Sequence, residues 1–363
     1  MSKQLVILAG KKAMQIIEQR GLRPEMVKVV VGAAGGPKWL VLHGLDRAIF
    51  GAWLKERTEP LFLLGSSIGA WRFAAVAQKN PTEALERFRS AYTEQHFQPN
   101  PTPAEIALEG ARILGTLLGP AGTGEILNHP FLRLSLVAAR CRWPVASDNR
   151  VLLSLGLMDA ILYNAVHRSA LKLFFERTFF YDPRETPPFL GSSELPGRAV
   201  PLSEKNLHQA LLASASIPLL MTGVKNIPEA PKGVYRDGGV IDYHFDLPFM
   251  GSDGDSERVV LYPHYLDRVI PGWFDKPLPW RKPHASNMDR VILVSPSREF
   301  IERLPYKKIP DRNDFTLFKG RDDERIAYWN AVIEASKGLG EEFLELVETG
   351  RILKSMQPIC EPA

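Results

Sequence analysis

The sequence predicts an α/β fold built on a mainly parallel central sheet. Two short apolar runs, Val27–Val31 and Leu61–Leu64, have the composition of buried parallel strands. A segment with helical character follows each run, Trp39–Lys55 after the first and Ile68–Gln78 after the second. A chain that alternates strand and helix in this way forms right-handed crossovers, which place its strands parallel in one sheet.

Further elements follow from similar patterns. Gln4–Gln19 has the apolar spacing of a helix, which Gly21 and Pro24 would end. Thr102-Pro103-Ala104-Glu105 has the N-cap, proline and acid that begin a helix. Val151–His167 is apolar, so we expect an internal helix there. Additional helices are expected at Glu83–Phe97, Ser203–Ser214, Arg298–Arg303 and Asp322–Val347. Additional strands are expected at Leu132–Ala139, Leu171–Phe175, Thr178–Tyr181, Arg258–Tyr262 and Arg290–Val294.

Length and composition are those of a large globular protein. The 363 residues can bury the core of one large α/β domain or of two smaller ones, and the hydrophobic content of 45% is ordinary. The net charge of +4 is small, and basic residues do not cluster with aromatic ones, so we expect no nucleic-acid partner. No segment approaches the length of a membrane span.

The cysteine content bears on the cellular compartment. The two cysteines, Cys141 and Cys360, are far apart in the chain, which argues against a disulfide framework and indicates a reducing compartment. The apolar patch Leu5–Ala9 is too short for a signal peptide, so we expect a cytoplasmic protein. The sequence has no metal-binding motif, and we expect neither a metal nor another cofactor.

The segment Gly65-Ser66-Ser67-Ile68-Gly69 lies between the second strand and its helix and has the G-x-S-x-G pattern of a nucleophile elbow. In such an elbow, small flanking residues, here Gly65 and Gly69, let strand and helix approach closely. The central residue, Ser67, is strained and lies at the helix N-terminus, where the dipole favours negative charge. Ser66 does not fit the pattern, because Leu64 and Ile68 occupy its flanking positions. The alternative interpretation is an ordinary Gly-Ser turn.

A glycine-containing loop, Gly35-Gly36-Pro37-Lys38, follows the first strand. It would lie at the same edge of the sheet as Ser67, where backbone amides can form an oxyanion hole. Proline has no N–H, so the candidate donors are the amides of Gly35, Gly36 and Lys38. A tight turn without further function is the alternative, and a phosphate-binding loop is disfavoured because neither glycine-rich phosphate motif matches.

A carboxylate, Asp237, lies at the strand end within Val234–Val240, a segment with the pattern of a strand that runs into a turn. Gly238 and Gly239 follow it, so the carboxylate would be presented at the edge of the sheet with little side-chain cover. A hairpin turn is the alternative for an isolated Asp-Gly-Gly.

Taken together, these three motifs resemble those of the patatin-like phospholipase family. The loop Gly35–Lys38, the elbow Gly65–Gly69 and the motif Asp237–Gly239 stand in the family's order, and an Ala-Ser-x-x-x-Pro phrase at or near Ala215–Pro218 precedes the last of them. The family loop is usually Asp-Gly-Gly-Gly-x-Arg-Gly; the matching segment Ala33–Trp39 lacks the leading acid and the closing glycine. The resemblance covers roughly residues 27–249.

The resemblance implies a three-layer α/β/α sandwich with a catalytic core at 27–249. The sequence contains no clear linker, so we expect residues 1–363 to form one domain, with a C-terminal extension at 250–363. It implies a carboxylic ester hydrolase in which Ser67 is the nucleophile and Asp237 the base, without a catalytic histidine. The oxyanion hole would use Gly35, Gly36 and Lys38. The expected substrates are esters of fatty acids, such as phospholipids and lysophospholipids.

Several alternatives remain open from the sequence. The same acyl-enzyme would serve an acyltransferase or a thioesterase, and a non-catalytic lipid-binding relative would keep the elbow. A triad would add one of the histidines that follow Asp237, namely His244, His264 or His284. The aromatic, basic segment Ile270–Lys282 suits either a peripheral contact with a membrane or a loop packed on the body of the protein.

Overall fold

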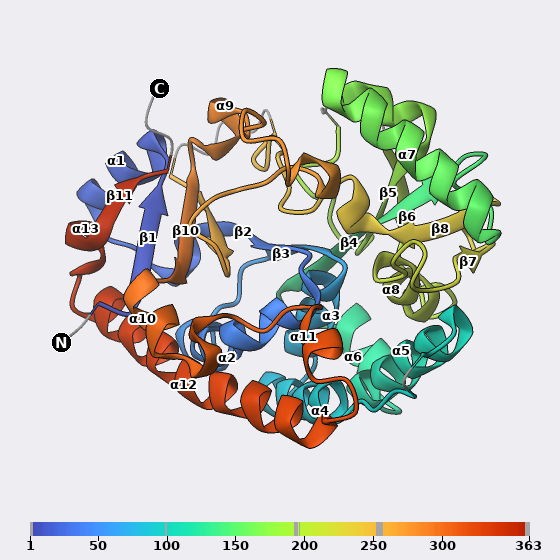
Figure 1. The fold of residues 1–363 in the computed structure, drawn as a ribbon. Coiled ribbons are helices and arrows are strands. Elements are labelled where there is room, and N and C mark those ends of the chain that lie inside the picture. The colour runs from blue at the N-terminus through green and yellow to red at the C-terminus, as the bar shows by residue number, and fades with distance from the viewer. Residues whose placement is uncertain (1–2, 99, 192–194, 196, 252–256, 360–363) are drawn as a thin grey trace.

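The computed structural model describes residues 3–98, 100–191, 195, 197–251 and 257–359. They form a three-layer α/β/α sandwich around an 11-stranded, mostly parallel sheet, which confirms the predicted fold class. The strand order is β11-β1-β10-β9-β2-β3-β4-β5-β6, and β8 pairs with β4 and β7. Figure 1 shows α2, α4 and α12 gathered on one side of the strands, with α7 and α9 toward the other. Among the described residues, no helix is both long and apolar enough to cross a bilayer.

The strands agree with most of the sequence prediction. The parallel strands at the centre of the sheet are β10, β9, β2, β3 and β4, whereas β5 and β8 run antiparallel to β4, and β1 antiparallel to β10. The strand bounds are β1 Leu5–Ala9, β2 Val27–Gly32, β3 Leu61–Ser66, β4 Leu132–Cys141, β5 Phe175–Tyr181, β6 Gly197–Pro201, β7 Val224–Lys225, β8 Val234–Asp237, β9 Val259–Pro263, β10 Val291–Pro296 and β11 Met356–Pro358.

The helices connect the strands and cover the sheet. The α-helices are α1 Lys11–Arg20, α2 His43–Ala48, α3 Ile68–Val76, α4 Pro81–Thr93, α5 Pro103–Leu118, α6 Gly122–Leu127, α7 Arg150–Val166, α8 Leu207–Ser214, α9 Ala285–Met288, α10 Arg298–Arg303, α11 Asp314–Leu317, α12 Asp322–Glu348 and α13 Ile352–Ser355. Shorter helical segments of 3-10 or π geometry are η1 Pro24–Met26, η2 Gly36–Leu42, η3 Ile49–Trp53, η4 Arg168–Leu173, η5 Gly238–Val240, η6 Trp273–Asp275 and η7 Pro305–Lys307. The expected capping box of Thr102 and Glu105 begins α5.

The sheet brings the loops after β2 and β3 to one edge. The two strands are parallel and in register, with Gly32 opposite Gly65. Every residue of β3 is buried, because helices cover both faces of the sheet at its centre. The loop that contains Gly35 and the elbow that contains Ser67 therefore leave the sheet side by side.

The last third of the chain is built into the same sheet. β9 pairs with β2, and β10 lies between β9 and β1, so both strands stand beside the N-terminal ones. Helix α12 approaches α2 so closely that a Cβ atom at Gly44 would lie 2.1 Å from the carbonyl oxygen of Ser336. The amide of Gly44 donates a hydrogen bond of 3.0 Å to Ser336 Oγ. Of the two cysteines, Cys141 is buried in β4, and Cys360 lies outside the described residues.

Two predictions of local structure are wrong. Gln4–Gln19 is not one helix: Leu5–Ala9 forms β1, which pairs with β10 and β11. Helix α1 begins only after Gly10, where a Cβ atom would lie 2.0 Å from the carbonyl oxygen of Met288. Leu171–Phe175 is not a strand either, because η4 extends to Leu173 and β5 begins at Phe175. In the first case, strand partners nearly three hundred residues away override the local helical spacing.

The prediction that Val151–His167 forms an internal helix is half right. The segment forms α7, but only one side of the helix is buried. The buried residues include Leu153, Leu157 and Ala160. Its other side is apolar as well and is exposed to solvent.

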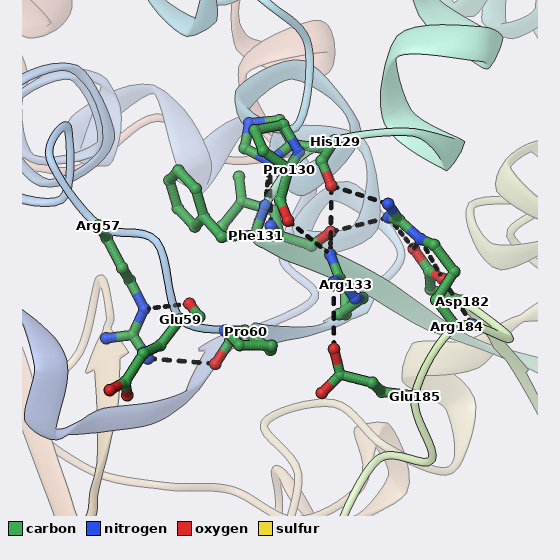
Figure 2. A network of polar contacts seen from close by, with 11 residues as sticks. Arg57, Glu59, Pro60, His129, Pro130, Phe131, Arg133, Asp182, Arg184 and Glu185 are labelled. Carbon is green, nitrogen blue, oxygen red and sulfur yellow. Dashed lines mark hydrogen bonds and ion pairs between the residues drawn. The ribbon is translucent and has the colours of Figure 1, made fainter.

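Polar contacts fix the amino ends of β3 and β4, at the edge of the sheet opposite Ser67. Figure 2 shows Arg57 donating to the carbonyl oxygen of Pro60, just before β3, over 3.1 Å. Before the neighbouring strand β4, the carbonyl oxygen of His129 accepts from Arg133, which is on β4, over 3.2 Å and from Arg184, which follows β5, over 2.8 Å. These guanidinium groups satisfy carbonyl groups that precede the strands, so the sheet is anchored away from the candidate site.

Candidate active site

Ser67 occupies a strained turn between β3 and α3. Its φ of 54° and ψ of −126° lie in a region that residues with a side chain seldom adopt. The flanking glycines explain how the turn forms. A Cβ atom at Gly65 would lie 2.5 Å from Ala70 Cα, and one at Gly69 would lie 2.1 Å from the carbonyl oxygen of Gly32. Larger residues at either position would push strand and helix apart.

Ser67 and Asp237 are joined by a buried hydrogen bond. Ser67 Oγ donates to Asp237 Oδ2 over 2.8 Å, and the two residues are only 3% and 4% exposed. The other carboxylate oxygen, Oδ1, accepts from the amide of Gly239 over 2.7 Å. The sheet brings Ser67 and Asp237 together, because β4 pairs with β3, which precedes Ser67, and with β8, which ends at Asp237. One oxygen of the carboxylate is thus held by the backbone while the other faces the serine hydroxyl.

Ser214, at the end of α8, holds the elbow in place. Its hydroxyl accepts a hydrogen bond of 3.0 Å from the amide of Ser67 and donates one of 2.6 Å to the carbonyl oxygen of Val137. Two residues further on, the carbonyl oxygen of Ser216 accepts from the amide of Asp237 over 2.9 Å. The Ala-Ser-x-x-x-Pro phrase marked this segment in the sequence, but the sequence did not predict that its residues hydrogen-bond to the backbone of Ser67 and Asp237.

The surroundings of Asp237 raise the pKa of its carboxyl group above that of an exposed one. Burial raises the pKa of its carboxyl group, because the charged form loses its hydration. The cation of Arg312 and the hydrogen bonds from Ser67 and Gly239 act in the opposite direction and lower the pKa, as does Lys276, but burial is the larger effect. A carboxylate with a raised pKa is a stronger base than an exposed one.

The glycine loop borders the same site. Gly35 caps η2, and Gly36, with a φ of 56°, begins it. Gly36 and Pro37 line the cavity into which Ser67 faces. Within the described part of the chain, the amides of Gly35 and Gly36 have no hydrogen-bond acceptor. Lys38 is not among the residues that line the cavity, and its ammonium group lies 5.0 Å from the centre of the Tyr265 ring.

Tyr265 and His244 support this loop from behind. The amide of Ile270 donates to His244 Nδ1 over 3.0 Å, so the ring proton is on Nε2, which donates to the Tyr265 hydroxyl over 2.8 Å. The Tyr265 hydroxyl in turn donates to the carbonyl oxygen of Ala34, directly before the glycines. Burial lowers the pKa of His244 well below its usual value, which keeps the imidazole neutral.

Histidines stand apart from the serine. Among the described residues, no histidine is hydrogen-bonded to Ser67 or Asp237. His264 is buried with its pKa lowered to about 3 by desolvation, and its Nδ1 accepts from the amide of Leu266 over 2.9 Å. His284 is exposed and lies 2.7 Å from a carboxylate oxygen of Asp246. The geometry therefore favours a pair of residues over a triad.

Ser67 lies in the wall of a large, mainly apolar cavity of about 700 Å³. A cavity of this size and character suits a small molecule with an extended apolar group. The elbow, the segment before α5, α5 itself, the loop after α8, and α11 enclose it. Its apolar side chains include Ile68, Trp71, Phe97, Ile106, Ile113, Ile217, Leu220, Met221 and Phe315.

Arg312, which the sequence patterns did not single out, completes the site from the C-terminal third. It lines the cavity, and a Cβ atom at Gly36 would lie 3.2 Å from its Nε. Arg312 is also the strongest influence that lowers the pKa of Asp237. Among the described residues, no cluster of three or more metal-ligating side chains occurs at this site or elsewhere.

No protein-family model matches the chain, and no curated protein sequence matches it. Solved structures that resemble it include VipD from Legionella pneumophila, with a TM-score of 0.32 and 14% identity over 66% of this chain and 50% of VipD. Another is human GIVD cytosolic phospholipase A2, with a TM-score of 0.33 and 12% identity over 98% of this chain and 67% of that protein. Its complex with methyl gamma-linolenyl fluorophosphonate and terbium chloride gives a TM-score of 0.35 and 12% identity over 95% of this chain and 63% of that one. The chain thus spans half the length of VipD, and at these scores no activity is transferred from either protein.

Proposed function

We propose that this protein is a serine acyl hydrolase of patatin type, which cleaves carboxylic esters of fatty acids through a Ser67–Asp237 dyad. The observation that carries the proposal is the buried hydrogen bond of 2.8 Å between the two side chains, in the wall of the apolar cavity. A serine hydroxyl is a weak nucleophile unless a base removes its proton, and Asp237 is the base within reach.

The reaction begins with attack of Ser67 Oγ on the ester carbonyl carbon. As the new bond forms, the hydroxyl proton passes to Asp237 Oδ2, and the carbonyl oxygen becomes an oxyanion. The amides of Gly35 and Gly36, with that of Lys38, are the proposed donors to this oxyanion. Donors of this kind are typically worth about 3 kcal/mol each in the transition state.

The tetrahedral intermediate collapses to an acyl-enzyme. The bond between the carbonyl carbon and the alcohol oxygen breaks, and Asp237 returns the proton to the leaving alcohol. Water then enters, gives a proton to Asp237 and attacks the acyl carbon. The bond between this carbon and Ser67 Oγ breaks, Asp237 returns the proton to Oγ, and the fatty acid leaves. The hydrogen bond from the Gly239 amide holds the carboxylate in the same orientation in both halves of the reaction.

The cavity supports fatty acyl esters as the substrates. Its apolar wall would hold the acyl chain, and the charged group of Arg312 lies beside Gly36, near the polar end of the substrate. Phospholipids and lysophospholipids carry both an acyl chain for the apolar wall and a charged head group for Arg312. We further propose that the chain is a single domain, because β9 from its last third pairs with β2, and that it acts in the cytoplasm, because its two cysteines are far apart in the sequence.

The test is an ester panel of increasing acyl length, run on the wild type, Ser67→Ala and Asp237→Asn. We expect both variants to lose activity, and a fluorophosphonate to label Ser67 in the wild type. The matched control is Ser66→Ala, because Ser66 is the adjacent buried serine and its hydroxyl has no hydrogen-bond partner among the described residues. Activity that survives in Ser67→Ala or Asp237→Asn would refute the mechanism, and added alcohol or thiol acceptors would reveal a transferase.

A further inference from the structure

Helix α7 exposes an apolar face along its whole length. One side of the helix is packed against the protein, but the opposite side bears large hydrophobic residues, with Val151 at 68% and Val166 at 86% exposure. The residues of this face, which we call the α7 face, are Val151, Leu152, Leu155, Met158, Leu162 and Val166. Such a continuous exposed patch is unusual on a globular protein and marks an interaction site.

The spacing of the α7 face shows that it is one surface. Positions 151, 155, 158, 162 and 166 follow each other at intervals of three or four, so their side chains form one stripe down the helix. After Arg150, the one charged residue within the helix is Asp159, which is exposed and lies on the same side as Leu155 and Leu162, at spacings of four and three. Figure 1 shows α7 at the outer edge of the molecule, with no other element beyond it.

Two exposed tryptophans lie close to α7. Trp143, 76% exposed, precedes the helix in the chain, and the amide of its neighbour Arg142 donates to the carbonyl oxygen of Phe174, next to the exposed Leu173. Trp280, 66% exposed, borders the same small hollow as Val166, at the carboxyl end of the helix. Tryptophan is the residue that prefers the boundary between water and the interior of a bilayer.

Basic side chains border this apolar surface. Arg150 begins α7, Lys172 follows the helix beside Leu173, and Lys282 follows Trp280. Arg142 precedes the helix, and its guanidinium group lies 3.6 Å from a carboxylate oxygen of Glu176. All four are exposed. An apolar helical face with tryptophans and cations at its border has the chemistry of a helix that lies in the plane of an anionic membrane surface.

We propose that the α7 face docks onto the surface of an anionic lipid bilayer. The helix would lie flat, with its exposed leucine, valine and methionine side chains among the acyl chains and the bordering cations at the headgroups. This inference goes beyond the proposed ester hydrolysis, because docking requires no reaction at Ser67.

The segment before α7 connects this surface to the cavity. Asp148 Oδ1 accepts from the amide of Gly223 over 3.2 Å and from Arg236 over 2.8 Å. Gly223 ends the loop that contains Leu220 and Met221, both of which line the cavity, and Leu220 is 44% exposed. A bilayer docked on the α7 face would therefore lie near one rim of the cavity.

The test is co-sedimentation with phosphatidylcholine vesicles that contain phosphatidylserine, and with vesicles of phosphatidylcholine alone. We expect the wild type to bind the anionic vesicles more tightly, with an affinity that falls as salt is added. The variant Leu155→Gln with Leu162→Gln should bind at least about tenfold more weakly. Both residues are more than half exposed, so the variant should fold as the wild type does, which its melting temperature checks.

The matched control is Leu108→Gln, because Leu108 is 73% exposed on another helix, α5. This variant should bind vesicles as the wild type does. Equal binding of the double variant and the wild type would overturn the proposal, as would equal binding to both kinds of vesicle or no binding at all. A wild-type dimer that the double variant converts to a monomer, without vesicle binding, would also overturn it in favour of a second copy of the chain. Measuring binding with Ser67→Ala as well separates docking from hydrolysis.

Discussion

The hydroxyl of Ser214 links the amide of Ser67 to the carbonyl group of Val137, although 147 positions separate the two serines. This one side chain satisfies a buried donor at the strained turn and a buried acceptor on β4. It fixes the backbone of the residue proposed as the nucleophile, which the elbow motif alone cannot do.

Ser214→Ala is therefore expected to lower both stability and activity. The buried amide and carbonyl group would lose a partner, which costs about 1–3 kcal/mol of unfolding free energy. Because Ser67 would be less well placed, kcat/KM should fall about tenfold or more. Chemical denaturation and ester kinetics measure the two effects. Ser216→Ala is the control, since the hydroxyl of this neighbouring buried serine donates to Leu212 and touches neither proposed catalytic residue; an equal loss of activity in both variants would contradict the role given to Ser214.

The pH profile should report the raised pKa of Asp237. The base must be ionised to accept a proton, so kcat/KM should rise with pH along an acidic limb whose midpoint lies above the value of about 4 for an exposed carboxyl group. Because the Arg312 cation lowers the pKa of Asp237, Arg312→Gln should move this midpoint to higher pH, and Arg312→Lys should restore it in part. An unchanged midpoint in Arg312→Gln would show that Arg312 does not lower the pKa of Asp237.

Asp237→Asn should stabilise the folded protein near neutral pH while it abolishes activity. The pKa of Asp237 is higher in the folded than in the unfolded chain, so the folded state holds its proton more tightly. In the wild type, stability therefore falls as pH rises from the unfolded pKa to the folded one. The asparagine variant lacks this loss, so its advantage in melting temperature should be present at neutral pH and vanish at acidic pH. A variant that is less stable than the wild type at neutral pH would contradict this prediction.

Gly36→Ala should reduce kcat by about a hundredfold. Its φ of 56° disfavours any side chain, and the new Cβ atom would lie 3.2 Å from Arg312 Nε, so the proposed oxyanion donor would move. Steady-state kinetics should show a larger change in kcat than in KM. Gly115→Ala, within α5, is the control: its Cβ atom would meet no other atom within 4 Å, and it should leave kcat unchanged while it raises stability by about 0.5–1 kcal/mol. A similar kcat in Gly36→Ala and the wild type would exclude the Gly36 amide as a donor.

The predictions that succeeded depend on residues close together in the chain. The strands β2 and β3 are apolar runs followed by helical segments, and the elbow depends on Gly65, Ser67 and Gly69, which lie within five positions. Where the prediction failed, the decisive contacts were distant. Leu5–Ala9 is a strand because β10 and β11 pair with it on either side, and no local pattern predicts those partners.

The sequence by itself determined that strands and helices alternate, which serine stands in the elbow, and that an Asp-Gly-Gly motif ends a later strand. Only the tertiary structure decided that the carboxylate of Asp237 lies 2.8 Å from Ser67 Oγ, that Ser214 and Arg312 belong to the same site, and that one apolar side of α7 faces solvent. The physical reason is that backbone conformation responds to neighbours within a few residues, whereas burial and side-chain contact depend on which segments the sheet brings together.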